Sequence, residues 1–175
     1  MEVKFTPWRM AYIQNDSGPK IEGCVLCGLG QLQPEAENLV LHHGTTCYVV
    51  MNKFPYNTAH LMVVPYAHTA DLPGLDAATA TELFDLTRRA VAILGQEYQP
   101  HGFNTGMNLG RTAGAGIEAH LHMHIVPRWE GDANFMPIVG GTKLVPEALD
   151  QTWARLRPVF ASDKKTRRQE DKKTR

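Results

Sequence analysis

The 175-residue chain lacks the long apolar segments that are typical of membrane proteins. It also lacks the many cysteines that are typical of small secreted proteins. Nowhere does it contain the run of about eighteen apolar residues that a membrane-spanning helix needs. The N-terminal segment MEVKFTPWRMAYIQND interrupts every apolar run with a charged, proline or asparagine residue, so no signal-peptide core is expected. Three cysteines, an odd number, argue against a disulfide framework. We therefore expect a cytoplasmic protein with no membrane partner.

A net charge is also absent, because 18 Lys and Arg residues balance 18 Asp and Glu residues. The charges are unevenly distributed. Residues 161–175 carry seven basic and three acidic side chains, a net charge of +4, which leaves −4 on residues 1–160. An acidic body predicts no nucleic-acid-binding surface. The tail is rich in Lys, Arg, Gln and Thr, which indicates a disordered terminus, although contact with RNA or an acidic partner stays open.

The length and the apolar content of 43% fit one domain at residues 1–160, followed by the basic tail 161–175. Segments rich in β-branched residues predict strands at residues 46–52, 60–65, 103–109 and 120–127. Apolar residues at three- and four-residue steps predict a long helix from Asp76, its N-cap, to Tyr98, and a shorter helix is expected at residues 147–157. This order indicates an α+β fold with a mostly antiparallel sheet and the long helix packed on one face.

The segment HLHMHIVPR at residues 120–128 places His120, His122 and His124 at alternate positions. On a strand, placed here at residues 119–128, the three imidazoles would share one face about 6.6–6.8 Å apart, close enough to surround one phosphate. Neutral imidazole has a pKa near 6.5 and offers a lone pair that can attack phosphorus at pH 7. Histidines on the solvent side of an ordinary strand are the alternative.

HLHMHIVPR resembles the signature of the histidine-triad (HIT) superfamily, His-φ-His-φ-His-φ-φ with φ hydrophobic. Five further segments resemble, in the same order, bacterial members of the fragile-histidine-triad branch, which includes dinucleoside polyphosphate hydrolases and phosphorylases. They are PWRMAYI, the Cys-x-x-Cys, NKFPYNTAHLMVVP, HGFNTGMNLG and PRWEGDANF. The resemblance implies a HIT-like fold, a nucleotide substrate, and a homodimer with the long helix and its neighbouring strand at the interface.

The resemblance also implies the role of each site residue. His122 would attack the α-phosphorus and form a nucleotidyl-histidine, with its other ring nitrogen held by a backbone carbonyl within the triad. His124 would bind the phosphoryl oxygens, and His120 completes the catalytic triad. The implied nucleotide-binding residues are Asn52 toward the ribose, and His60, Asn108, Gly114, Ala115 and Gly116 toward the phosphates.

One departure from the family pattern leaves the acceptor open. Many members carry Gly-Gln-Ser or Gly-Gln-Thr before the triad, where this chain has Gly-Ile-Glu-Ala at residues 116–119. We expect a nucleotidyl hydrolase or transferase acting on dinucleoside polyphosphates or adenylated small molecules. The alternatives are a diadenosine tetraphosphate phosphorylase with phosphate as acceptor, a nucleotide-binding scaffold with little turnover, and a nucleic-acid-binding protein acting through the basic tail.

A metal site is the second expected feature. Cys24 and Cys27 have the Cys-x-x-Cys spacing that suits two ligands of one tetrahedral zinc. The resemblance to zinc-containing members implies His68 and His120 as the other two. Such a Cys2His2 shell would be closed and structural. A metal-free reduced cysteine pair or a redox pair remains the alternative.

Overall fold

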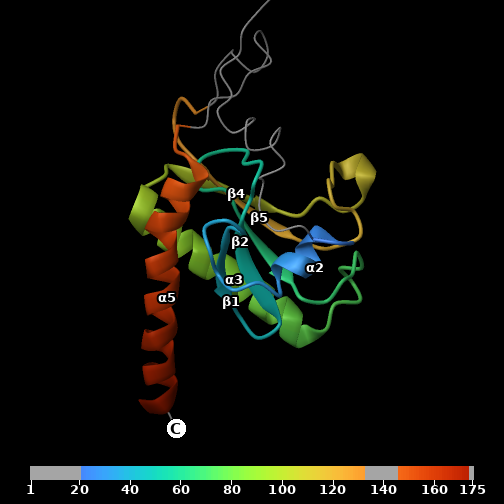
Figure 1. The fold of residues 1–175 in the computed structure, drawn as a ribbon, viewed down its shortest axis with the longest axis horizontal. Coiled ribbons are helices and arrows are strands. Elements are labelled where there is room, and N and C mark those ends of the chain that lie inside the picture. Colours follow the sequence, from blue (N-terminus) through green and yellow to red (C-terminus); the bar gives the residue numbers. More distant parts are fainter. Residues whose placement is uncertain (1–20, 133–145, 174–175) are drawn as a thin grey trace, which may run out of the picture.

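The computed structural model describes residues 21–132 and 146–173, and its centre is an antiparallel sheet (Figure 1). Within these residues the strands are β1 (Val40–His43), β2 (Cys47–Met51), β3 (Leu61–Pro65), β4 (Gly102–Gly106) and β5 (Met123–Arg128). Their order across the sheet is β1-β2-β3-β5-β4, and every neighbouring pair is antiparallel. The predicted α+β class with a mostly antiparallel sheet is confirmed, and β5 lies inside the sheet.

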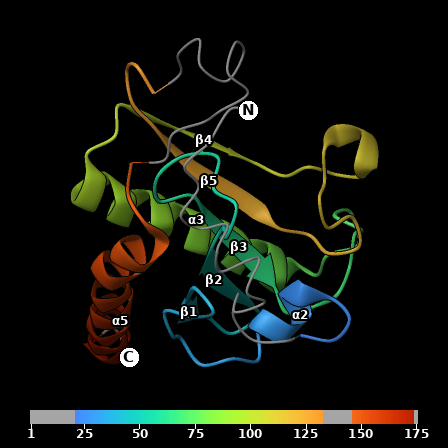
Figure 2. The same ribbon diagram turned by 45° about the horizontal axis from the view of Figure 1, so that its top comes forward.

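Helix α3 (Ala77–Tyr98) covers one face of the sheet (Figures 1 and 2). The Asp76 side chain accepts a hydrogen bond from the main-chain N–H of Thr79 at 3.0 Å and caps the first turn. The apolar face of α3, including Leu86 and Leu94, is buried, and α3 contacts β2, β3 and β5. Burial of each leucine contributes about 1.5–3 kcal/mol. The predicted long helix and its cap are therefore confirmed.

The C-terminal helix α5 (Leu149–Lys173) corrects the prediction of a shorter helix at residues 147–157. It spans 25 residues against 22 in α3, and it continues through most of the segment for which the sequence predicted disorder. Lys, Arg, Gln and Glu have favourable helix propensities, so a composition typical of disorder also permits a helix. The start of α5 is anchored to the sheet, because Trp153 Nε1–H donates to the Val40 carbonyl at 3.0 Å. The division of the chain at residue 160 stays a prediction.

The sequence does not predict strand β1 or the short helix α2 (Val25–Leu29), which directly follows Cys24. The four predicted strands all exist, with bounds that differ by up to three residues. In both views α2 and the 3-10 turn η1 (Arg111–Ala113) lie on the side of the sheet opposite to α5 (Figures 1 and 2). Among the described residues no helix is long and apolar enough to cross a membrane. Segments 1–20, with PWRMAYI, and 133–145 lie outside the described residues.

Candidate active site

His122 is held in a single orientation by the main chain. Its Nδ1 lies 2.8 Å from the carbonyl oxygen of His120. A carbonyl oxygen only accepts hydrogen bonds, so Nδ1 carries the proton, and in the neutral ring Nε2 keeps the lone pair. The side chain is 7% exposed. The geometry thus provides a buried imidazole whose free nitrogen is available as a nucleophile.

A chain of hydrogen bonds sets the protonation pattern of the neighbouring His124. The main-chain N–H of Tyr56 donates to His60 Nδ1 at 3.0 Å, so neutral His60 carries its proton on Nε2. His60 Nε2 lies 3.0 Å from His124 Nδ1 and donates to it. Neutral His124 therefore carries its own proton on Nε2. That buried Nε2 has no hydrogen-bond partner within the described part of the chain, which leaves one N–H donor beside His122.

Burial, followed by the proximity of His122, lowers the pKa of His124 to about 4. The rings of His122 and His124 lie 4.8 Å apart, centroid to centroid, at an interplanar angle of 78°. His124 is accordingly neutral at pH 7. A neutral donor beside His122 could bind a phosphoryl oxygen without placing a second positive charge next to that ring.

The expected row of three histidines on one strand face is corrected by the structure. Strand β5 begins at Met123, so His120 and His122 precede it and only His124 belongs to it. The pairing with β3 starts at Met123 with Val63, and the carbonyl of Pro65, at the end of β3, accepts a hydrogen bond from the His120 ring at 2.8 Å. The His120 ring contacts Cys24, Cys27 and His68 instead.

A second cluster joins three distant segments of the chain. Four residues each offer one ligand atom, and these atoms all lie within 4.8 Å of one another, so the group could hold a metal ion. The four residues are Cys24, Cys27, His68 and His120. His120 Nδ1 is 3.4 Å from each sulfur and 3.3 Å from His68 Nδ1, and Cys27 Sγ is 3.2 Å from His68 Nδ1. These separations fit a tetrahedral ion, since metal–ligand bonds of about 2.0–2.3 Å place the ligand atoms about 3.3–3.8 Å apart.

The protonation states of the cluster also suit a metal. His120 Nε2 donates to the Pro65 carbonyl, which leaves the Nδ1 lone pair facing the sulfurs. Burial lowers the pKa of His120, so the ring stays neutral. Burial, and then the neighbouring Cys24, raise the pKa of the Cys27 thiol, so a cation would have to displace its proton. The donor set therefore fits a thiolate-binding divalent ion.

The structure places the proposed nucleotide-binding residues on two loops. The Asn52 side-chain oxygen accepts the Phe54 N–H at 2.9 Å, which fixes the orientation of this side chain. Gly114 adopts a φ of +89°, and its N–H and that of Ala115 donate to carbonyls within the same turn. Those two N–H groups therefore shape the turn, and the predicted anion contact would fall to Gly116. Asn108 is half-buried.

A HIT domain family model matches residues 33–131, more than half of the chain. A relative in Mycobacterium tuberculosis, named AP-4-A phosphorylase, is 40% identical over 164 residues, which cover 86% of this chain and 84% of that protein. The chain belongs to the HIT domain family. The histidines of both clusters lie within the matched residues, whereas Cys24 and Cys27 precede them.

Two solved structures agree with this HIT domain fold. A Zn-bound histidine triad family protein from Mycobacterium smegmatis is 20% identical with a TM-score of 0.64, over 82% of this chain and 97% of that one. Diadenosine triphosphate hydrolase from Plasmodium falciparum, in complex with Cyclomarin A, is 16% identical with a TM-score of 0.55, over 73% and 77% of the two chains. At these identities the likeness supports the fold alone.

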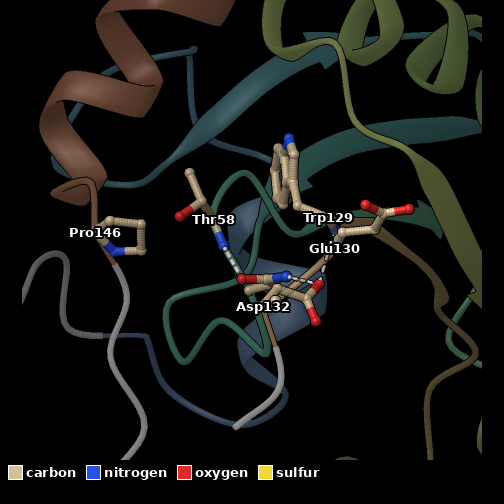
Figure 3. A pocket seen from close by; sticks show the side chains of 7 residues that line it. Thr58, Trp129, Glu130, Asp132 and Pro146 are labelled. Carbon is tan, nitrogen blue, oxygen red and sulfur yellow. Dashed lines mark hydrogen bonds between the residues drawn. The ribbon is translucent and has the colours of Figure 1, made fainter.

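A pocket of about 370 Å³ lies between the loop before β3 and the segment that follows β5 (Figure 3). Its lining residues are Asn57, Thr58, Trp129, Glu130, Gly131, Asp132 and Pro146. None belongs to either histidine cluster of the HIT domain. Asp132 is held by Arg128 through two hydrogen bonds of 2.7 and 2.8 Å, which lower the pKa of its carboxyl group.

Sequence reasoning about this HIT domain missed two groups, Tyr56 and the Pro65 carbonyl. Tyr56 lies within NKFPYNTAH, four residues before His60, but nothing in that spacing indicates a contact with His124. The Pro65 carbonyl orients His120 across 55 residues of sequence. A main-chain acceptor carries no residue-type signal, so only the folded structure reveals it.

Proposed function

We propose that this HIT domain cleaves dinucleoside polyphosphates by nucleotidyl transfer to His122, with inorganic phosphate as the final acceptor. The observation that carries the proposal is the hydrogen bond from His122 Nδ1–H to the His120 carbonyl, which leaves Nε2 as a buried nucleophile. The 40% identity to a protein named AP-4-A phosphorylase supports both the substrate class and the acceptor.

The reaction proceeds in two steps. His122 Nε2 attacks the α-phosphorus, and the bond from that phosphorus to the bridging oxygen breaks, so a dinucleoside tetraphosphate releases a nucleoside triphosphate. An oxygen of inorganic phosphate then attacks the same phosphorus, the phosphorus–nitrogen bond breaks, and a nucleoside diphosphate leaves. Water in place of phosphate would yield a nucleoside monophosphate, which is the hydrolase alternative.

The neighbouring residues stabilise the charge that develops on phosphorus. The Nε2–H of His124 donates to a non-bridging oxygen, and His60 fixes that donor. Asn52 contacts the ribose, and Asn108 with Gly116 contacts the phosphates. Glu118, in the stretch that departs from the family pattern, is bound to Arg111 on the surface at 2.6 Å. It therefore supplies no neutral hydroxyl or amide to the leaving oxygen.

Product analysis on diadenosine tetraphosphate tests the acceptor. With inorganic phosphate present we expect ADP and ATP in equal amounts, and without phosphate turnover should nearly stop. AMP with ATP, at a rate that phosphate does not change, would replace phosphorolysis by hydrolysis. Binding without turnover under either condition would favour the nucleotide-binding scaffold.

We further propose that Cys24, Cys27, His68 and His120 hold one structural zinc ion. Their spacing fits a tetrahedral shell, and the fold relative from Mycobacterium smegmatis is described as Zn-bound. Four protein ligands would leave no open position, so the ion would anchor α2 and the His68 segment against the strand that follows His120. The proposed reaction would remain with His122, His124 and His60, which are not ligands of this ion.

We also propose that the protein is a homodimer. β4 lies at the sheet edge and Phe84 on α3 is 61% exposed, which supports a homodimer through this helix and strand. Light scattering at micromolar concentration tests the dimer, with Phe84→Glu as the disrupting variant.

We propose a cytoplasmic location and no nucleic-acid partner for this protein. Deletion of residues 161–175 should leave turnover unchanged, whereas a loss of RNA affinity alone would assign that segment to RNA.

A further inference from the structure

Tyr56 covers the pair of histidines that supports the nucleophile. Its ring lies 4.7 Å from the His60 ring and 5.6 Å from the His124 ring, centroid to centroid, tilted by 32° and 35°. The side chain is itself 48% exposed, so it stands between the histidine pair and solvent. Both histidines behind it are buried, at 1% and 8% exposure.

The loop that carries Tyr56 is fixed at both sides of that residue. The Asn52 N–H donates to the His60 carbonyl at 2.9 Å, which closes the base of the loop. The buried Asn57 side chain donates to the Pro127 carbonyl at 3.1 Å and to Asp132 at 2.8 Å. A ring held by such a loop keeps its place over the histidines without a ligand.

We propose that Tyr56 is a positioning residue for the transfer reaction, whose ring shields the His60–His124 pair from water while its main-chain N–H fixes the pair's tautomers. This inference rests on the proposed function. The aromatic ring of Tyr56 acts through the two histidines and needs no contact with the substrate.

The value of this shield follows from the charge of the intermediate. A nucleotidyl group on His122 Nε2, with Nδ1 still protonated, makes that ring cationic. A second positive charge on His124, whose ring lies 4.8 Å away, would repel it. Within the described chain the titratable groups facing His124 are His60, His122 and Tyr56, and none of them is a carboxylate that would pair with a cation. Exclusion of water is therefore the means that keeps His124 neutral.

The experiment compares Tyr56→Ala with Tyr56→Phe in the full-length protein by NMR titration of isotope-labelled histidines, with His124 assigned from a His124→Asn spectrum. In Tyr56→Ala we expect the pKa of His124 to rise by at least about one unit toward its ordinary value near 6.5. Tyr56→Phe keeps the ring and should stay within about 0.3 unit of the wild type. Phe54→Ala, which removes an exposed ring from the same loop, is the matched control and should leave the titration unchanged.

The kinetic counterpart is the pH dependence of kcat/KM on diadenosine tetraphosphate. Between pH 8 and pH 5.5 the ratio of Tyr56→Ala to wild type should fall by up to about tenfold, the loss expected if the pKa returns to 6.5. An unchanged His124 titration in a folded Tyr56→Ala protein would overturn the shield. An equal shift in Tyr56→Phe would also overturn it, because the hydroxyl group would then be responsible. The NMR titration does not depend on turnover. An inactive wild-type protein would therefore refute the proposed function, and the titration would still test whether Tyr56 shields His124.

Discussion

His120 and His122 are joined by their main chain and side chain in a way that links the two histidine clusters. The carbonyl oxygen of His120 accepts the Nδ1–H of His122 at 2.8 Å, while the His120 ring nitrogen Nδ1 lies 3.4 Å from both cysteine sulfurs. One residue therefore supplies a ligand of the proposed metal ion and the acceptor that orients the proposed nucleophile. Loss of the metal should disturb catalysis through this orientation.

His122→Ala should lower turnover at least about a thousandfold, because it removes the nucleophile. Nucleotide binding should remain measurable, since His60, His124 and Asn52 are still in place. Steady-state kinetics and calorimetric titration with a non-hydrolysable dinucleotide check both parts. A turnover number near that of the wild type would remove His122 from its role.

A covalent intermediate should be trapped on residues 120–124. Rapid mixing of enzyme and substrate without phosphate, followed by an alkaline quench, should preserve an acid-labile nucleotidyl group on that peptide. Mass spectrometry before and after acid treatment detects it, and the His122→Ala protein is the control. If single-turnover product forms while the peptide stays unmodified, direct displacement by the acceptor replaces the covalent route.

About one zinc per chain should copurify with the protein. Replacing Cys24 and Cys27 together by serine should lower Tm by several degrees, with a smaller effect on the chemical step, because the ion acts through folding. Elemental analysis and melting curves with and without a strong chelator measure this. Substoichiometric metal together with an unchanged Tm would leave the cysteines as an ordinary reduced pair.

His68→Ala and His120→Ala form a matched pair for the link between the clusters. Each removes one ligand of the proposed ion, so both should weaken metal retention. The His120 ring, which is bound to the Pro65 carbonyl, also fixes the position of the His120 main-chain carbonyl that holds His122. His120→Ala keeps that carbonyl but frees it to move, so it should lower kcat more, by about tenfold relative to His68→Ala. Equal kcat values at equal metal content would show that the metal cluster does not orient the nucleophile.

Glu82 should make the stability of the fold depend on pH below about 4.5. Burial raises the pKa of Glu82, but hydrogen bonds from the N–H groups of Thr45, Thr46 and Cys47 outweigh it, and the pKa lies below its ordinary value. A folded-state pKa below the unfolded one stabilises the protein fully above the unfolded value, and this stability is lost as the pH falls through the folded value.

Glu82→Gln should therefore lower the free energy of unfolding at pH 7 by about 1–3 kcal/mol and reduce its dependence on pH below 4.5. Urea unfolding between pH 7 and pH 3 measures both effects. Asp85→Asn, which removes an exposed carboxylate from the same helix, should change stability by about 0.5 kcal/mol or less. A pH dependence that Glu82→Gln leaves intact would assign it to another group.

Local patterns predicted a large part of this molecule. The Asp76 cap and the apolar spacing before Tyr98 define α3 through contacts between near neighbours in sequence, so its existence and bounds followed from the residues alone. Strand β1 escaped prediction because VLHH is short, and its two histidines, one of them buried, lack the alternation of a half-exposed strand. The length of α5 escaped because propensity does not separate a charged helix from a charged coil.

The sequence by itself determined which chemical groups are present and in what local order: an alternating set of three histidines and a Cys-x-x-Cys pair. Side-chain identity and spacing carry that information. Only the tertiary structure decided where each ring nitrogen points. It directs His120 toward Cys24 and Cys27, because the distant Pro65 carbonyl accepts from the other nitrogen of that ring. It directs His124 toward the side chain of His60, which lies 64 residues earlier in the sequence. Hydrogen bonds between residues dozens of positions apart leave no trace in the spacing of the sequence.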